Sequence, residues 1–126
     1  MKLRALVLSV FLFAYFPISS GFYPDRPVDI IHYSFAIVLN DSTDSIEGDA
    51  VITARLSNGS EYFDLDLKNA DASGKGMKVS SVMYGGKECR WDHSGNRIRI
   101  FSPASSVPDS IVQIRIVYSG IPADGL

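Results

Sequence analysis

The chain has 126 residues, a formal net charge of −2 and 21% charged residues. This near balance of charge gives no reason to expect a nucleic-acid partner, which usually requires clustered lysine and arginine. Hydrophobic residues make up 46% of the sequence, which is enough for a folded core and argues against intrinsic disorder.

The N-terminal residues are typical of a secretory signal peptide. A short basic segment, Met1–Arg4, precedes an apolar run over residues 5–16 that is too short to span a bilayer comfortably. A membrane anchor or a buried helix is the alternative reading of such a run. Small residues follow, with cleavage expected after Ser20 or Gly21. We therefore predict a signal peptide over residues 1–20, export to the periplasm, the cell surface or the medium, and no membrane contact after cleavage.

The stretch after this leader predicts a long β-hairpin. An irregular lead-in over residues 21–27 comes first, and apolar residues then recur at alternate positions, which indicates a half-buried strand. The inward positions are Ile31, Tyr33, Phe35, Ile37 and Leu39. A second strand alternates in the same way, with apolar or small residues at the even positions from Ile46 to Leu56. Residues 40–44 between them are rich in Asn, Asp, Ser and Thr, which favour turns.

Five further segments alternate in a similar manner and predict short strands. They cover residues 61–68, 77–84, 87–93, 97–101 and 111–119. In the second of these the apolar positions change parity at Ser80–Ser81, which indicates a β-bulge. Gly85–Gly86 and Ser94–Asn96 are turn residues, and the prolines within residues 102–110 exclude a central strand there. About seven short strands without helical periodicity predict an all-β, antiparallel sandwich.

The side chains that could carry chemistry each have a simpler structural explanation. Cys89 is the single cysteine, so an exported domain would have no internal disulfide, and a small buried hydrophobe is expected there. Trp91 with Tyr84 is interpreted as core packing rather than a sugar-stacking platform. His32 and His93 are interpreted as surface or rim histidines that bond to a neighbour, rather than as metal ligands.

Two pairs of aspartates could suggest a calcium site. They are Asp41 with Asp44, and Asp64 with Asp66. Calcium takes about six to eight oxygen ligands and usually a loop punctuated by glycine, so a solvated face is the simpler interpretation. The sequence also has no G-x-S-x-G motif and no glycine-rich phosphate loop.

Three short motifs occur in an order and at a spacing that together point to a family. They are His32-Tyr33 in the first strand, Ile46-Glu47-Gly48 opening the second, and Tyr118-Ser119-Gly120 closing the last. From Val28 to about Leu126 the chain resembles the N-terminal β-domain of the aminopeptidase N family of zinc metallopeptidases. The resemblance implies a curved, saddle-like antiparallel β-sandwich. We accordingly expect this β-domain over residues 28–119, and residues 120–126 to begin a connection to a remainder outside this sequence.

The resemblance also implies a division of labour with a second domain. In that family a thermolysin-like catalytic domain carries an H-E-x-x-H zinc motif, with a later glutamate as third ligand, and a G-A-M-E-N type exopeptidase motif. Here His32 and His93 precede Tyr33 and Ser94, so neither begins a zinc motif. We expect no catalytic, cofactor-binding or metal-binding residue in this chain, and zinc only in the parent's catalytic domain.

The expected function is therefore that of a non-catalytic domain of an exported zinc aminopeptidase. It would pack on its own catalytic domain and help to wall the cavity that binds the parent's peptide substrates, and it should be inactive alone. The alternative is a free-standing secreted β-sandwich that binds a protein or a glycan. A docking domain should leave apolar residues exposed when isolated. The candidates, out of phase with the inward positions, are Val38, Val51, Ile111 and Val117.

Overall fold

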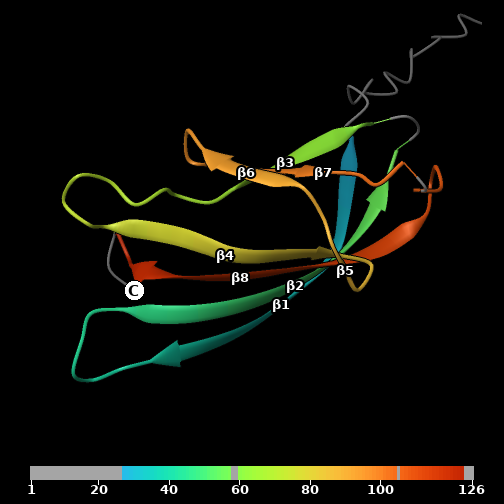
Figure 1. The fold of residues 1–126 in the computed structure, drawn as a ribbon. Helices are drawn as coiled ribbons and strands as arrows, with labels where there is room; N and C mark the ends of the chain where they lie inside the picture. The colour runs from blue at the N-terminus through green and yellow to red at the C-terminus, as the bar shows by residue number, and fades with distance from the viewer. Residues whose placement is uncertain (1–26, 58–59, 105, 124–126) are drawn as a thin grey trace, which may run out of the picture.

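The computed structural model describes residues 27–57, 60–104 and 106–123, which form eight β-strands in two antiparallel sheets (Figure 1). The predicted signal peptide over residues 1–20 lies outside the described residues, as do residues 21–26 and 124–126. No helix in the described part of the chain is long and apolar enough to cross a membrane. The prediction of an all-β, antiparallel fold is confirmed.

The larger sheet has five strands and the smaller one has three. In spatial order the larger sheet consists of β1 (Val28–Leu39), β2 (Ile46–Leu56), β8 (Ile111–Ile121), β4 (Gly76–Tyr84) and β5 (Lys87–Glu88). The smaller sheet consists of β3 (Tyr62–Asp66), β7 (Arg97–Phe101) and β6 (Trp91–Ser94). In Figure 1 the smaller sheet forms a separate layer above the larger one.

The core lies between the two sheets and follows the alternation of the sequence. Every even position of β2 from Ile46 to Leu56 is buried, as predicted. The largest fully buried side chains come from both layers; they are Phe63, Ile98, Ile100, Ile114 and Val82. Each such side chain contributes about 1.5–3 kcal/mol on removal from water. With no disulfide among the described residues, this packing holds the layers together.

Two β-bulges adjust which side chains face the core. The pairing of β4 with β8 shifts between Val79 and Ser81, which confirms the bulge predicted from the parity change. A second shift, between Ile30 and His32 in β1, was not predicted. It turns both Ile30, opposite Ala54, and Tyr33, opposite Ile52, toward the same face of the sheet.

The predicted single strand over residues 87–93 is wrong. Residues Lys87–Glu88 pair with β4 in the larger sheet, whereas Trp91–Ser94 pair with β7 in the smaller one. The chain crosses between the layers at Cys89 and Arg90, where each residue keeps a backbone bond to its own side: Cys89 N donates to Val82 O (3.4 Å), and Phe101 N donates to Arg90 O (3.0 Å). Alternation alone does not reveal that the pairing partner changes between two sheets.

Candidate functional site

The inner face of the larger sheet is only partly covered by the smaller sheet. Val28 and Ile30, at the start of β1, pack against the core. The later inner-face residues of β1 lie directly opposite core-facing positions of β2, yet they are open to solvent. They are Tyr33, Phe35, Ile37 and Leu39, which are 47%, 56%, 48% and 63% exposed, and which we call the β1 strip.

The β1 strip corrects the expectation of a half-buried strand. From Ile31 to Leu39 every residue of β1 is exposed. The physical reason is the size of the second layer, because strands of four or five residues cannot cover a sheet whose longest strands have eleven or twelve. The exposed apolar area is on the order of 400 Å², which is the size of the largest apolar patch on a typical monomer, and such a patch is often functional.

A groove of about 600 Å³ runs between the β1 strip and the smaller sheet. Tyr33 and Phe35 of β1 line the groove, and so do Leu65 and Leu67 of the chain around β3. Tyr118 of β8, in the larger sheet, also lines it. The rings of Tyr33 and Phe35 stack with centroids 5.7 Å apart and planes 9° from parallel. Burial raises the pKa of the Tyr118 phenol. Apart from Asp64 and Asp66, the residues that line the groove present mainly aromatic and aliphatic surface.

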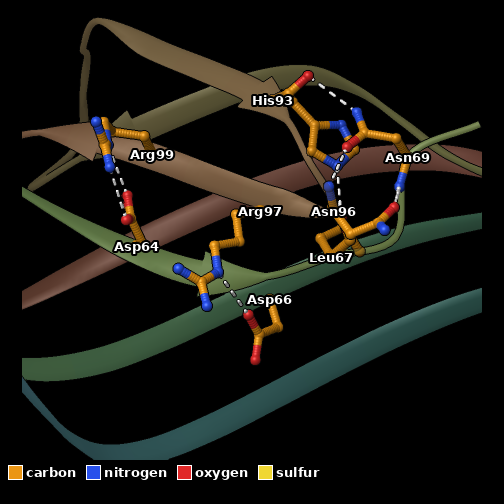
Figure 2. A network of polar contacts seen from close by, with 8 residues as sticks. All are labelled: Asp64, Asp66, Leu67, Asn69, His93, Asn96, Arg97 and Arg99. Carbon is orange, nitrogen blue, oxygen red and sulfur yellow. Dashed lines mark hydrogen bonds and ion pairs between the residues drawn. The ribbon is translucent and has the colours of Figure 1, made fainter.

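The two aspartates of β3, Asp64 and Asp66, border the same groove, and arginines of β7 neutralise them (Figure 2). Arg99 donates to both carboxylate oxygens of Asp64 from Nε (2.8 Å) and Nη2 (2.9 Å). These hydrogen bonds from Arg99 hold the pKa of the Asp64 carboxyl below its ordinary value. Arg97 Nε lies 3.5 Å from Asp66 Oδ1. These arginine partners were not predicted from the sequence, because they lie on another strand.

His93 and two asparagines fasten the chain after β3 to the hairpin of β6 and β7 (Figure 2). His93 Nε2 lies 2.8 Å from Leu67 O, so this nitrogen carries the proton and donates. Asn69 Nδ2 donates to His93 O (2.9 Å). Asn69 and Asn96 are joined by two hydrogen bonds. Asn69 N donates to Asn96 Oδ1 (3.1 Å), and Asn96 N donates to Asn69 Oδ1 (2.7 Å). This network has a structural role and leaves His93 a rim residue.

The other side chains singled out in the sequence lie apart from one another. His32 is exposed opposite Thr53, and Asp41 and Asp44 are exposed in the turn between β1 and β2. Within residues 27–57, 60–104 and 106–123 no three His, Cys, Asp or Glu side chains gather where they could hold a metal ion. The described residues therefore do not fit a zinc site.

Tyr84, Trp91 and Cys89 belong to the core and its margin. Tyr84 is buried in the central cluster, and Trp91 and Cys89 pack against it while half-buried. Burial raises the pKa of the Cys89 thiol, which disfavours the reactive thiolate. The core-packing interpretation of Tyr84 with Trp91 agrees with this arrangement.

The four valine and isoleucine candidates for docking lie on the opposite, outer face. Val38 and Ile111 are 61% and 59% exposed, but Val51 and Val117 are half-buried. Val51 lies opposite Arg115, and Val117 lies opposite Asp49. The side chains of Arg115 and Asp49 form an ion pair on this face. The larger group of exposed apolar side chains is on the inner face, along the β1 strip, which the sequence analysis interpreted as half-buried.

Comparison with known proteins finds this fold among solved structures. No protein-family model matches the sequence, and no curated protein matches it. Solved structures with the same fold include the M1 zinc metallopeptidase of Deinococcus radiodurans, a mutant of that enzyme bound to a Tyr-Ser-Ala substrate, and a two-domain M1 zinc metallopeptidase mutant bound to L-tryptophan. Each is 23% identical with a TM-score of 0.62, and the match covers 77% of this chain.

The match covers only 21% of each of those chains, so this chain spans about a fifth of their length. The matched portion is their N-terminal part. At this identity the likeness is one of fold. The resemblance found in the sequence is confirmed at that level: the chain has the fold of the N-terminal part of M1 zinc metallopeptidases.

Proposed function

We propose that this chain is a non-catalytic N-terminal β-domain of an exported zinc aminopeptidase. It packs on the catalytic domain of its parent and helps to wall the cavity that receives peptide substrates. One observation carries the proposal: the chain has the fold of one fifth of a two-domain M1 zinc metallopeptidase. The inner face of its larger sheet, which is uncovered along the β1 strip, supports it.

The β1 strip suits a permanent domain contact. It extends the apolar inner face beyond the core, because Tyr33 and Phe35 lie opposite the buried residues Ile52 and Ala50. Covering about 400 Å² of apolar surface contributes on the order of 10 kcal/mol of transfer free energy, before the cost of ordering the contact. The arginine partners of Asp64 and Asp66 leave little unpaired charge at the rim, so an apolar partner would meet no large desolvation penalty.

Zinc chemistry is assigned to the parent's catalytic domain, since the described residues offer no ligand set. The role of this chain is to shape and to shield, and its own side chains perform no bond cleavage. The basic segment, the apolar run and the small residues over positions 1–20 support export.

The experiment that tests this function is hydrolysis of aminoacyl reporter substrates by the purified, zinc-loaded chain. We expect a rate equal to buffer with zinc alone. Turnover that a chelator abolishes would refute the proposal. The coding frame downstream of Leu126 provides an independent test: we expect H-E-x-x-H and a G-A-M-E-N type motif, and their absence from the full transcript would count heavily against a parent aminopeptidase.

A further inference from the structure

We propose that β1 is a pairing edge through which two copies of this chain join their larger sheets about a two-fold axis. The two β1 strands would run antiparallel and form one continuous sheet. This interaction goes beyond the proposed function, because it uses the edge of the sheet. The inner face, with the β1 strip, stays open to a covering domain.

β1 has the properties of a largely unprotected edge, since its one bulge lies near its start, between Ile30 and His32. It is the terminal strand of the larger sheet and has no neighbour beyond it among the described residues. It is 12 residues long, and from Ile30 to Leu39 it contains no Asp, Glu, Lys, Arg or Pro. Soluble proteins usually blunt such edges with charges, prolines or very short strands, because the unpaired N–H and C=O groups are a template for another strand.

The other three edge strands are protected by those same devices. β5, at the far edge of the larger sheet, has two residues, and both of them, Lys87 and Glu88, are charged. In the smaller sheet, β3 carries Asp64 and Asp66, and the four-residue β6 carries Asp92. β5 pairs with only Met83 and Tyr84, so the earlier part of β4 is also an edge, and it carries Lys78 and the bulge before Ser81. Among the described strands, β1 is therefore the long edge with the least protection. Pairing is therefore expected to close at a dimer rather than to extend into a fibre.

The sequence of β1 is complementary to itself in one register. The run of consecutive exposed residues in β1, from Ile31 to Leu39, has Phe35 at its midpoint. A two-fold axis at Phe35 sets that residue opposite itself and Tyr33 opposite Ile37 of the second copy. On the outer face it sets Ser34 opposite Ala36. Within residues 31–39 every opposed pair consists of aromatic, aliphatic or small side chains, and no two like charges face each other.

The size of the contact indicates a reversible dimer. Because the inner face stays open, edge pairing of the two β1 strands would bury at most about 1,000 Å² in total, which is at the low end of specific interfaces. The measurement is the mass of the purified chain across a concentration series, by light scattering and sedimentation. We expect the mass to rise toward twice the monomer value, 13.8 kDa for the full chain. A monomer at every concentration up to about 100 μM would overturn the proposal, since no useful dimer would then form.

Cysteine cross-linking tests the register, with Cys89→Ala as the background so that each introduced thiol stands alone. Directly opposed residues have Cα atoms about 4.5–5.5 Å apart, within the range of a disulfide. Phe35→Cys should therefore cross-link to itself. Tyr33→Cys should not, because its two copies would be separated by about 14 Å along the strands. An equal mixture of Tyr33→Cys with Ile37→Cys should cross-link, and equal cross-linking of every variant alone would overturn the two-fold pairing.

Two lysine substitutions, one at the two-fold axis and one away from β1, test whether dimerisation depends on β1. Phe35→Lys places two lysines directly opposite each other and should raise the dissociation constant at least about tenfold. Val107→Lys is the control, because Val107 is 65% exposed but lies in the loop before β8, and its dissociation constant should not change. Far-UV circular dichroism confirms that both variants are folded. Equal effects of the two lysines would contradict a specific β1 contact.

Discussion

Gly48 is the residue that lets the ring of Tyr118 lie flat on the larger sheet. The two residues are directly opposed on β2 and β8, and a Cβ at position 48 would stand 2.2 Å from Cζ of Tyr118. Position 120 also requires glycine, because a Cβ there would stand 2.1 Å from the carbonyl oxygen of Gly76. The contact of Gly48 with Tyr118 links the motifs Ile46-Glu47-Gly48 and Tyr118-Ser119-Gly120, which pair residue by residue on β2 and β8.

Gly48→Ala should lower the free energy of unfolding by about 1–3 kcal/mol, as overpacking does in a well-filled site. Urea denaturation measures the loss. In a Tyr118→Leu background, where no ring occupies the space, the same substitution should cost less than about 1 kcal/mol. An equal loss in both backgrounds would show that the ring is not the reason for glycine.

Asp64 makes a pH-dependent contribution to stability. Hydrogen bonds from Arg99 lower the pKa of its carboxyl in the folded chain, so the contribution is present above the unfolded pKa of about 3.9 and is lost as the pH falls. Asp64→Asn should therefore reduce the free energy of unfolding at pH 7 and change it little near pH 2. The loss should be small and should shrink with added salt, because the pair is partly exposed.

Asp66→Asn is the matched control, since Asp66 is 92% exposed and its closest contact with Arg97 is 3.5 Å. Its effect at pH 7 should be smaller than that of Asp64→Asn. Chemical denaturation at the two pH values measures both variants. A loss for Asp64→Asn that persists unchanged near pH 2 would rule out the ion pair as its cause.

At the level of elements, β1 and β3 carry phenylalanines in opposite situations. Phe63 of β3 is fully buried, whereas Phe35 of β1 is 56% exposed. Phe63→Ala should cost about 3–5 kcal/mol, and Phe35→Ala should cost less than about 1 kcal/mol because no cavity forms. Urea denaturation at a concentration where the chain is monomeric compares them. Similar losses would mean that the β1 strip is covered by other parts of the chain.

Features of a strand that depend on neighbouring residues could be predicted from the sequence, whereas features that depend on distant strands could not. The burial of alternate residues in β2 and the bulge at Ser80–Ser81 were predictable, because the pattern of neighbouring side chains contains them. The break between β5 and β6 was not, because it depends on which distant strand each half pairs with. The exposure of the β1 strip was missed for a related reason: alternation is the same whether or not a second layer covers the strand.

At the level of the whole molecule, the unequal sizes of the two sheets create the candidate site. Five strands in one layer and three in the other leave inner-face residues such as Phe35 and Leu39 without a covering partner. That mismatch is a property of the assembled fold, so no single segment announces it. The fold class followed from strand count and turn chemistry, whereas the position of the open face required the three-dimensional arrangement.

The crossing at Cys89 and Arg90 has a mechanical consequence. The link from Glu88 to Trp91 has three residue steps and spans at most about 11 Å, and it joins β5 of one layer directly to β6 of the other. The layers cannot slide or part by more than this tether allows while both strands remain paired. This link is the shortest connection between the layers, so shear across the sandwich loads it early, and the two sheets should come apart in one cooperative event.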